Sequence, residues 1–430
     1  MFAISKNRII ALFVSAALTI PGMVMNKAIL KKQTIFFVLI CFFFITPVTA
    51  DLPEKIEQDK YMAILLDALK NKNYEKALPY FEKLESIKLP LPDAFFFYKG
   101  DAMAKTNHPF LSEEAINQYL KAAGTKGKYY RQALAVLVEI EPVLQSERKR
   151  MGEEYYQRGI AKIKKGDFEG SIEDFNKAIE LDPKHHYAYA SRGQAYRQNG
   201  NFNESINDLN HAIKLYPQFG WAYAQRGETY RMKRDYEKAI DDFDRGLKFA
   251  NKLNWIFVNR ALAFKENGEF KNSINSWTNL LGREPSNAFA LNSRSWIFII
   301  NSEYEKAIID AERALELSSE TGYHDTLGWA LFHKGNLRKA KIQAKKVLSL
   351  NPNHIFSNLL LYRIESTRGD KREAIKKIRK LFDIYQNKSG TDVDLLRYFL
   401  NEIPIDKLHE SRRWHDYQVA IRGYSEQGLD

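Results

Sequence analysis

The chain has 430 residues, of which 45% are hydrophobic and 27% are charged, and this composition excludes a disordered or low-complexity protein. Its single cysteine, Cys41, excludes a disulfide framework. The net charge is +12, but residues 1–50 hold five basic residues and no acid, so the rest carries 60 basic and 53 acidic residues, or +7. That excess is too weak to indicate a nucleic-acid partner.

The first fifty residues predict an export signal. From Met25 there is a basic segment with Lys27, Lys31 and Lys32, then the apolar run TIFFVLICFFFI, and then small residues that end at Ala50. This order is typical of a secretory signal peptide, and the run is shorter than the roughly 18–20 residues of a membrane span. We therefore expect cleavage after Ala50 and a periplasmic or secreted product.

An earlier apolar stretch leaves the true start of the protein open. It covers 9–24 and is interrupted by Pro21 and Gly22. Either translation starts at Met23 or Met25, which we favour because the segment after Met25 is complete by itself, or residues 1–50 stay attached as a membrane anchor.

Residues 51–151 predict a helical region with a divergent repeat pattern. The segment YEKALPYF spaces an aromatic residue, an alanine and a second aromatic residue as the regular repeats further along the chain do. We expect a later helix that begins at Tyr129 and ends at Pro142, because proline lacks the amide proton that a helix interior requires.

From residue 152 to residue 388 the sequence repeats about every 34 residues. Each period holds two stretches with apolar residues three and four positions apart, as in Ile172, Phe175 and Ile179, which predicts a pair of amphipathic helices. Glycines separate the two stretches, and prolines such as Pro183 follow the second, which predicts a turn and a stop. The period is visible in Arg158, Arg192, Arg226, Arg260 and Arg294.

This pattern resembles the tetratricopeptide repeat, a 34-residue helical hairpin with small and aromatic residues at fixed positions. The first regular unit carries Tyr155, Gly159, Phe175 and Ala178 at such positions. The resemblance implies an all-α fold, a right-handed α-α superhelix in which stacked units bury the faces that none can bury alone. The expected seven units are 152–185, 186–219, 220–253, 254–287, 288–320, 321–354 and 355–388.

Residues 389–430 lose the repeat and predict one or two further helices. Leu395, Tyr398 and Phe399, and later Tyr417 and Ile421, have helical spacing. Repeat arrays need a cover over their last unit, so we interpret this segment as capping helices.

The resemblance also implies a concave groove lined by the first helix of each unit. At the groove-facing positions the sequence places aromatic residues in successive units and a short strip of basic ones. Such residues are enriched where proteins bind each other, so they predict a groove for a segment of a partner protein. Alternatively, the aromatic residues are core between neighbouring helices. The candidates are Tyr187, Trp221, Trp255, Phe289, Trp296, Trp329, Arg197, Arg231 and Lys265.

A regular charge pair accompanies the repeat. Arginine at the seventh position of a unit goes with aspartate at the twenty-third, as in Arg226 and Asp242, although Arg260 goes with Ser276. Either these pairs are structural contacts within or between hairpins, which we favour because the partner charge is already present, or the arginines form an anion-binding ladder.

The sequence gives no sign of catalytic chemistry. It contains no phosphate-binding loop and no nucleophile elbow, and His409 and His415 are six residues apart, which does not match the HExxH motif. We therefore predict a non-enzymatic scaffold, with no cofactor and no metal, that binds a protein in its groove and supports assembly of an envelope or secreted complex. The alternative is an enzyme, or an enzyme-accessory subunit, with a site in the flanking helical regions.

A basic amphipathic stretch, KREAIKKIRKLF at 371–382, leaves a peripheral membrane contact open. Ile375, Ile378 and Leu381 form its apolar stripe, and Arg379 belongs to a basic stripe that either faces solvent or touches anionic headgroups. No nucleic-acid partner is predicted, and the oligomeric state stays open.

Overall fold

The computed structural model describes residues 51–367, 372–386, 392–400, 411 and 413–422, and every regular element in these ranges is helical. The predicted all-α fold is therefore confirmed. The expected signal segment lies outside the described residues. The chain divides after Glu147 into two compact units, which we describe separately. None of the described helices is long and apolar enough to cross a membrane.

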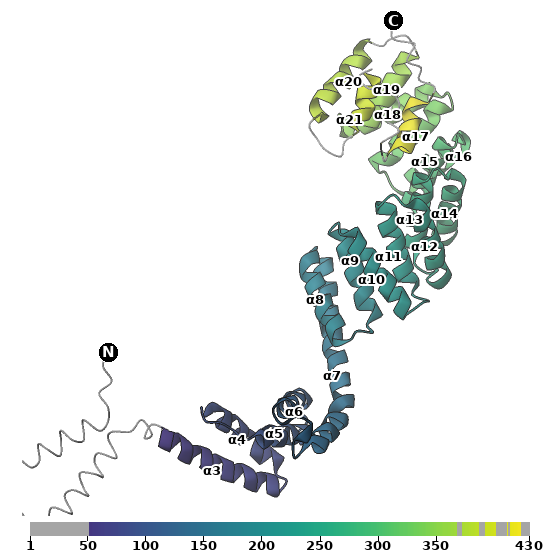
Figure 1. The fold of residues 1–430 in the computed structure, drawn as a ribbon. Coiled ribbons are helices and arrows are strands. Elements are labelled where there is room, and N and C mark those ends of the chain that lie inside the picture. Colours follow the sequence, from purple (N-terminus) through teal and green to yellow (C-terminus); the bar gives the residue numbers. More distant parts are fainter. Residues whose placement is uncertain (1–50, 368–371, 387–391, 401–410, 412, 423–430) are drawn as a thin grey trace, which may run out of the picture. The chain divides into compact units, whose positions relative to one another are not determined.

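The first unit contains two helical hairpins, formed by α3 with α4 and by α5 with α6 (Figure 1). Phe81 of α4 and Phe95 of α5 meet edge to face, with ring centroids 5.4 Å apart, in a core that also contains Leu65. The elements are α3 (Asp51–Lys70), α4 (Tyr74–Ser86), α5 (Asp93–Lys105), α6 (Pro109–Ala123) and the short 3-10 helix η2 (Gly124–Lys126).

Helix α7 (Tyr130–Lys164) continues through Pro142. The prediction that Pro142 ends this helix is therefore wrong. Proline removes the hydrogen bond to the carbonyl group of residue 138, but Val138 is 75% exposed, so water can replace the lost donor.

The second unit is an array of seven helical hairpins, of which the first pairs the end of α7 with α8. Successive first helices contact one another, as α9 contacts α11 and α15 contacts α17, and second helices such as α8 contact the first helix that follows. The helices are α8 (Phe168–Leu181), α9 (His186–Gln198), α10 (Phe202–Leu215), α11 (Gly220–Met232), α12 (Tyr236–Phe249), α13 (Asn254–Glu266), α14 (Phe270–Arg283), α15 (Ala288–Ile300), α16 (Tyr304–Leu317), α17 (Thr321–His333), α18 (Leu337–Leu350), α19 (Ile355–Ser366) and α20 (Arg372–Tyr385).

Small residues let the two helices of a hairpin approach each other. A Cβ atom at Gly193 of α9 would lie 2.8 Å from Leu209 and 3.1 Å from the carbonyl oxygen of Ser205, both on α10. The turns between the helices use the left-handed backbone region, which favours glycine. Residues in that region at these turns are Gly166, Gly200, Arg234, Gly268, Ser302 and Gly335.

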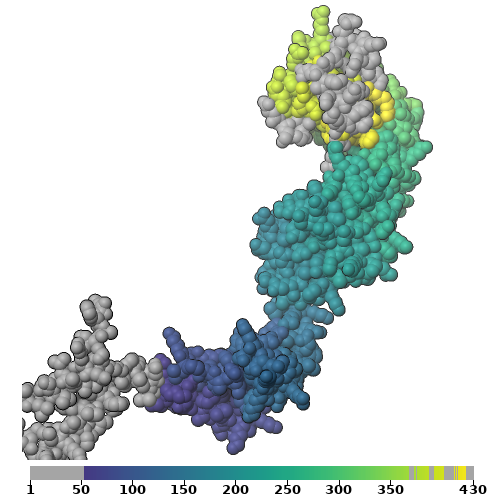
Figure 2. Space-filling model, in the orientation of Figure 1, coloured from purple at the N-terminus to yellow at the C-terminus, as the bar shows by residue number. Residues whose placement is uncertain are grey.

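Among the described residues, two helices follow the array, and they take different places. Helix α21 (Val393–Phe399) contacts α20, the last helix of the last hairpin. Helix α23 (Trp414–Ile421) instead contacts α15 and α19, which are both first helices. In Figure 2 the yellow atoms of α23 lie against the green repeats. Helix α23 therefore lies on first helices, that of the last unit included, whereas α21 packs on the second helix of the last unit.

Candidate functional site

The nine candidate residues all lie on the layer of first helices, which we call the first-helix face: α9, α11, α13, α15, α17 and α19. The structure divides them into three sets. Four aromatic residues near the starts of their helices remain at least partly accessible, three cations are paired within the chain, and the two other tryptophans lie next to α23.

The four accessible aromatic residues are both surface and packing residues. Tyr187 and Phe289 are 46% and 53% exposed, whereas Trp221 and Trp255 are half-buried. Tyr187 contacts Phe219 edge to face at 4.8 Å between ring centroids, and Phe219 contacts Trp221 at 5.7 Å. These rings therefore pack between neighbouring units and keep one side exposed, and their role in binding a partner stays a prediction.

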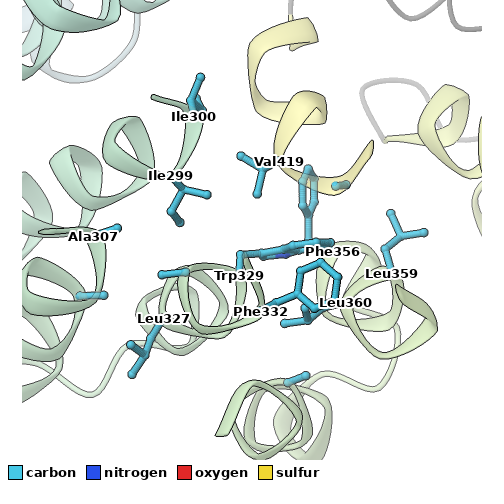
Figure 3. Packing of buried hydrophobic residues seen from close by; sticks show 14 of the residues in the cluster. Ile299, Ile300, Ala307, Leu327, Trp329, Phe332, Phe356, Leu359, Leu360 and Val419 are labelled. Atoms are coloured by element: carbon cyan, nitrogen blue, oxygen red, sulfur yellow. The ribbon is translucent and has the colours of Figure 1, made fainter. Parts of the chain in front are cut away.

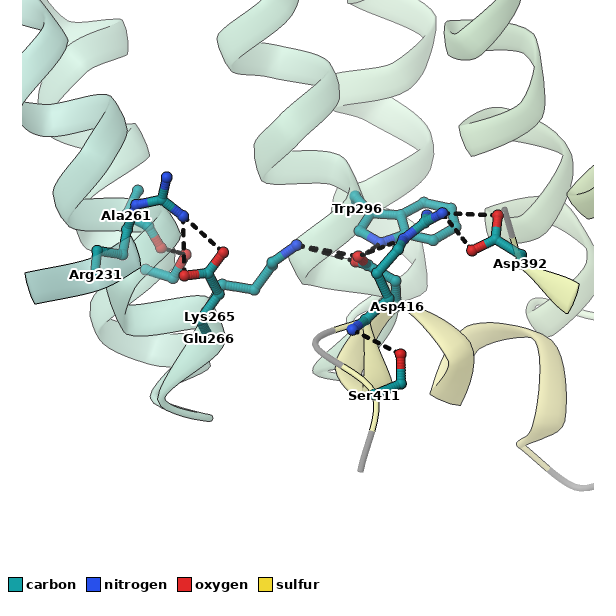
Figure 4. Close-up of polar contacts among 10 residues, drawn as sticks. Arg231, Ala261, Lys265, Glu266, Trp296, Asp392, Ser411 and Asp416 are labelled. Atoms are coloured by element: carbon teal, nitrogen blue, oxygen red, sulfur yellow. Dashed lines mark hydrogen bonds and ion pairs between the residues drawn. The ribbon is translucent and has the colours of Figure 1, made fainter. Parts of the chain in front are cut away.

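The three cations do not form an exposed basic strip. Arg197 is 6% exposed and donates to the carbonyl oxygen of Gln225 at 3.2 Å. Arg231 forms an ion pair with Glu228 at 2.8 Å. It forms a second one with Glu266, also at 2.8 Å (Figure 4). The sequence contained a signal for the first of these pairs, because Glu228 lies three residues before Arg231 on one helix face.

Trp329 is core in this structure, not a groove residue. It is 0% exposed and belongs to an apolar cluster that also includes Tyr398 of α21. Val419 of α23 belongs to the same cluster (Figure 3). The sequence analysis left core packing open as the alternative for this residue, but it did not place α23 on the first-helix face.

The first turn of α23 is held through the carboxylate of Asp416. The Nε1 atom of Trp296 donates to this carboxylate at 2.7 Å, and Lys265 Nζ lies 3.2 Å from it (Figure 4). Arg413 Nε is 3.6 Å away, and Asp416 itself is only 8% exposed. Two of the predicted groove residues therefore bind a helix of their own chain.

The last turn of α23 is held through its backbone carbonyl groups. His333 Nε2 donates to the carbonyl oxygen of Val419 at 2.7 Å, while the guanidinium of Arg363 donates to those of Ala420 and Arg422. The final carbonyls of a helix lack partners within it and attract cations, so this is a favourable way to bind a helix end. Sequence reasoning missed His333 and Arg363, although they occupy the thirteenth and ninth positions of their units.

Burial governs the charge of His333. Its ring stacks on Tyr304 at 5.4 Å between centroids, and burial, together with the nearby positive charges of Arg422 and Arg363, lowers its pKa to about 4. Burial also lowers the pKa of His415 on α23, whose ring contacts Phe270. Both imidazoles are therefore neutral while α23 is bound near neutral pH.

Acidification is expected to weaken the C-terminal part of the array. A histidine whose pKa is lowered in the folded chain takes up a proton more readily in the unfolded chain. Acidification therefore lowers the free energy of unfolding once the pH falls below the unfolded-state pKa of about 6.5. For His333 the loss at about pH 5, relative to about pH 8, is about 2 kcal/mol. Urea unfolding at both pH values, compared between the wild type and His333→Asn, measures this term. An unchanged pH dependence in the variant would contradict it.

The arginine–aspartate pairs are structural contacts. Arg192 donates twice to Asp208 of its own unit at 2.7 Å, and once to Asn176 of the preceding unit at 2.6 Å. Where the aspartate is missing, Arg260 bonds Ser276 at 2.9 Å and takes its carboxylate from Asp244 of the preceding unit at 2.6 Å. These arginines therefore join neighbouring hairpins, and their donors are directed at groups of the chain itself.

The first unit contains a surface hollow. It measures about 360 Å³ and is lined by Phe110, Leu111 and Val143 next to His108 and Glu147. One imidazole and one carboxylate beside apolar side chains give no argument for a catalytic site. Among the described residues, no group of three or more histidine, cysteine, aspartate or glutamate side chains is placed to hold a metal ion.

The basic amphipathic stretch forms helix α20. Its apolar stripe is used in packing, because Ile378 and Leu381 are 1% and 4% exposed. Lys376, Arg379 and Lys380 are exposed on the other side. Any contact of this helix with a membrane would therefore be electrostatic rather than an insertion of apolar side chains.

Comparisons with known proteins place the array among repeat proteins. Models described as TPR repeat and tetratricopeptide repeat match residues 152–200, 193–233, 258–320 and 322–354. Similar solved structures include PilW, a type IV pilus biogenesis factor, with 15% identity over 49% of this chain and 98% of PilW, at a TM-score of 0.44. MamA 41-end from Desulfovibrio magneticus RS-1 has 19% identity over 39% of this chain and 96% of that solved chain, at a TM-score of 0.37. Yeast Tom70 has 14% identity over 84% of this chain and 100% of Tom70, also at 0.37. None of the curated proteins matches the chain.

Proposed function

Because the chain is a tetratricopeptide repeat protein, we propose that it is a non-enzymatic scaffold that binds a segment of a partner protein along the first-helix face. The observation that carries this proposal is the set of accessible aromatic residues in successive units. Tyr187 and Phe289 are about half exposed, and Trp221 and Trp255 are half-buried beside them along the array. Covering such rings removes a large apolar area from water, which is the usual source of binding energy at protein interfaces.

The location that we propose for this scaffold is outside the cytoplasmic membrane, in the periplasm or the surrounding medium, where it supports assembly of an envelope or secreted complex. The support comes from the basic, apolar and small-residue segments that follow Met25 and end at Ala50. If residues 1–50 are not removed, the same scaffold is anchored to the membrane.

Tyr187→Ala/Phe289→Ala is expected to reduce the recovery of the partner about ten-fold or more without unfolding the chain. These two side chains are a sharper choice than the tryptophans, because they contribute less to packing. The measurement is co-purification from the native cell envelope, with the partner and the mature N-terminus identified by mass spectrometry. We expect the N-terminus at Asp51.

The matched control is Ile309→Ala/Leu350→Ala. These apolar side chains are 65% and 72% exposed, but they lie on the second helices α16 and α18. The control should keep the partner, and all melting temperatures should agree within a few degrees, as for surface substitutions. A partner that both double variants retain equally would overturn the proposed use of the first-helix face.

A further inference from the structure

The contacts that hold α23 on the first-helix face could also be made by a helix of another protein. At one end, Trp296 and Lys265 bind a single carboxylate, that of Asp416. At the other end, His333 and Arg363 bind backbone carbonyl oxygens, which every helix presents at its C-terminus.

The side chains of the last turn of α23 are also buried. Val419 and Ala420 are both 0% exposed, and Ile421 is 7% exposed. They belong to the same cluster as Trp329 and Phe356 of the array (Figure 3). Small aliphatic side chains therefore complete a site that is built for a short helix, with polar groups at both ends of an apolar floor.

We propose that the face of α13, α15, α17 and α19 is a receptor for a helix, and that a helix of the partner protein displaces α23 from it. This inference rests on the proposed function and specifies the partner's chemistry. The partner helix carries a carboxylate in its first turn and small aliphatic residues in its last turn. Helix α23 is then an internal competitor that occupies the receptor until the partner arrives.

The accessible aromatic residues explain how a partner helix can displace α23. Fourteen residues, 400–413, separate α21 from α23 in the sequence, and so short a covalent connection gives α23 an effective concentration on the order of millimolar. Helix α23 reaches α13 but leaves Tyr187 and Trp221 on α9 and α11 uncovered. A partner segment that fills the receptor and continues onto these rings makes contacts that α23 lacks.

A second copy of the chain is a weaker candidate for the occupant. Its α23 would make the same contacts as the internal helix and would cover none of the additional aromatic rings. It would also lose the advantage of the covalent connection. Exchange of α23 between copies therefore remains an outcome of the test, not the proposal.

The test uses a fluorescent peptide with the sequence of residues 411–422, titrated with the chain 51–430 and followed by anisotropy. Asp416→Lys in the chain places a cation opposite Lys265, which should release the internal helix. The peptide is then expected to bind this variant about ten- to hundred-fold more tightly than the wild type, because the receptor is open more often. A peptide that itself carries lysine in place of aspartate should not bind.

Two further variants keep the test decisive. Asp416→Asn removes the charge but keeps the shape, and we expect a smaller gain in affinity. Asp394→Lys, on α21 at a side chain that is 58% exposed, should behave like the wild type. The proposal is overturned if folded Asp416 variants bind no more peptide than the wild type, or if both of them fail to fold. It is also overturned if light scattering finds wild-type dimers that exchange α23. None of these results depends on Tyr187 or Phe289, so the proposed function is judged separately.

Discussion

Arg226→Met is expected to lower the free energy of unfolding of the second unit by about 3–5 kcal/mol. The Arg226 guanidinium donates to both carboxylate oxygens of Asp242, at 2.7 Å and 2.6 Å. Asp242 is 2% exposed, so the substitution leaves a buried carboxylate without the cation that pairs with it. A third hydrogen bond, to Asn210 of the preceding unit, is lost as well. Urea unfolding followed by circular dichroism measures the change.

The pH dependence of this loss gives a second check on its cause. Burial raises the pKa of Asp242, and Arg226 opposes that rise. Without Arg226, the carboxyl group should hold its proton to a higher pH in the folded chain than in the unfolded chain. The variant should therefore recover part of its stability between about pH 8 and about pH 5. A loss of equal size at both pH values would point to lost packing instead.

Arg260→Met is the matched control, because its partners are different. Arg260 bonds Asp244, whose side chain is 50% exposed, and the hydroxyl group of Ser276. Its removal leaves no buried charge, so we expect a loss of about 1 kcal/mol or less. Arg226→Met/Asp242→Leu should recover most of the loss of the single variant, since both charges are then absent. Equal losses for Arg226→Met and Arg260→Met would contradict this account.

The fold could be predicted because its information is local and repeated. Every 34 residues the same small, aromatic and proline positions return, and the helices of the array begin close to the predicted starts of the units. The prediction about Pro142 was wrong because it used only the loss of one hydrogen bond. Whether that loss ends a helix depends on whether water reaches the carbonyl group, and the sequence alone does not give the exposure of Val138.

The site was predicted less well because its contacts are remote in sequence. Asp416 lies 120 residues from Trp296 and 151 residues from Lys265, outside the repeat that organises the rest of the chain. Nothing in the spacing places α23 on the first helices rather than over the last unit. The residues of the array that bind α23 were easier to predict, since His333 and Arg363 occupy positions that the repeat pattern directs towards the groove.

Trp329→Ala is expected to cost about 3–5 kcal/mol of folding free energy, which is typical of removing a large buried aromatic side chain. The ring is 0% exposed and lies 5.8 Å from the Phe332 ring and 6.4 Å from the Phe356 ring, between centroids. It also contributes to the cluster that contains Val419 of α23 (Figure 3). The cavity should therefore weaken both the sixth unit and the binding of α23. Urea unfolding measures the total loss.

Two further substitutions separate core packing from an exposed binding ring. Trp329→Phe should cost distinctly less than Trp329→Ala, because the indole Nε1 has no hydrogen-bond partner among the described residues and phenylalanine removes that unsatisfied donor. Trp221→Ala, at a half-buried ring, should cost about 1–2 kcal/mol. If Trp329→Ala costs no more than Trp221→Ala, Trp329 is not core, and the predicted groove extends to α17. If the predicted order holds, Trp329 belongs to the core that α23 covers, and the candidate rings that stay accessible while α23 is bound are those of Tyr187, Trp221, Trp255 and Phe289.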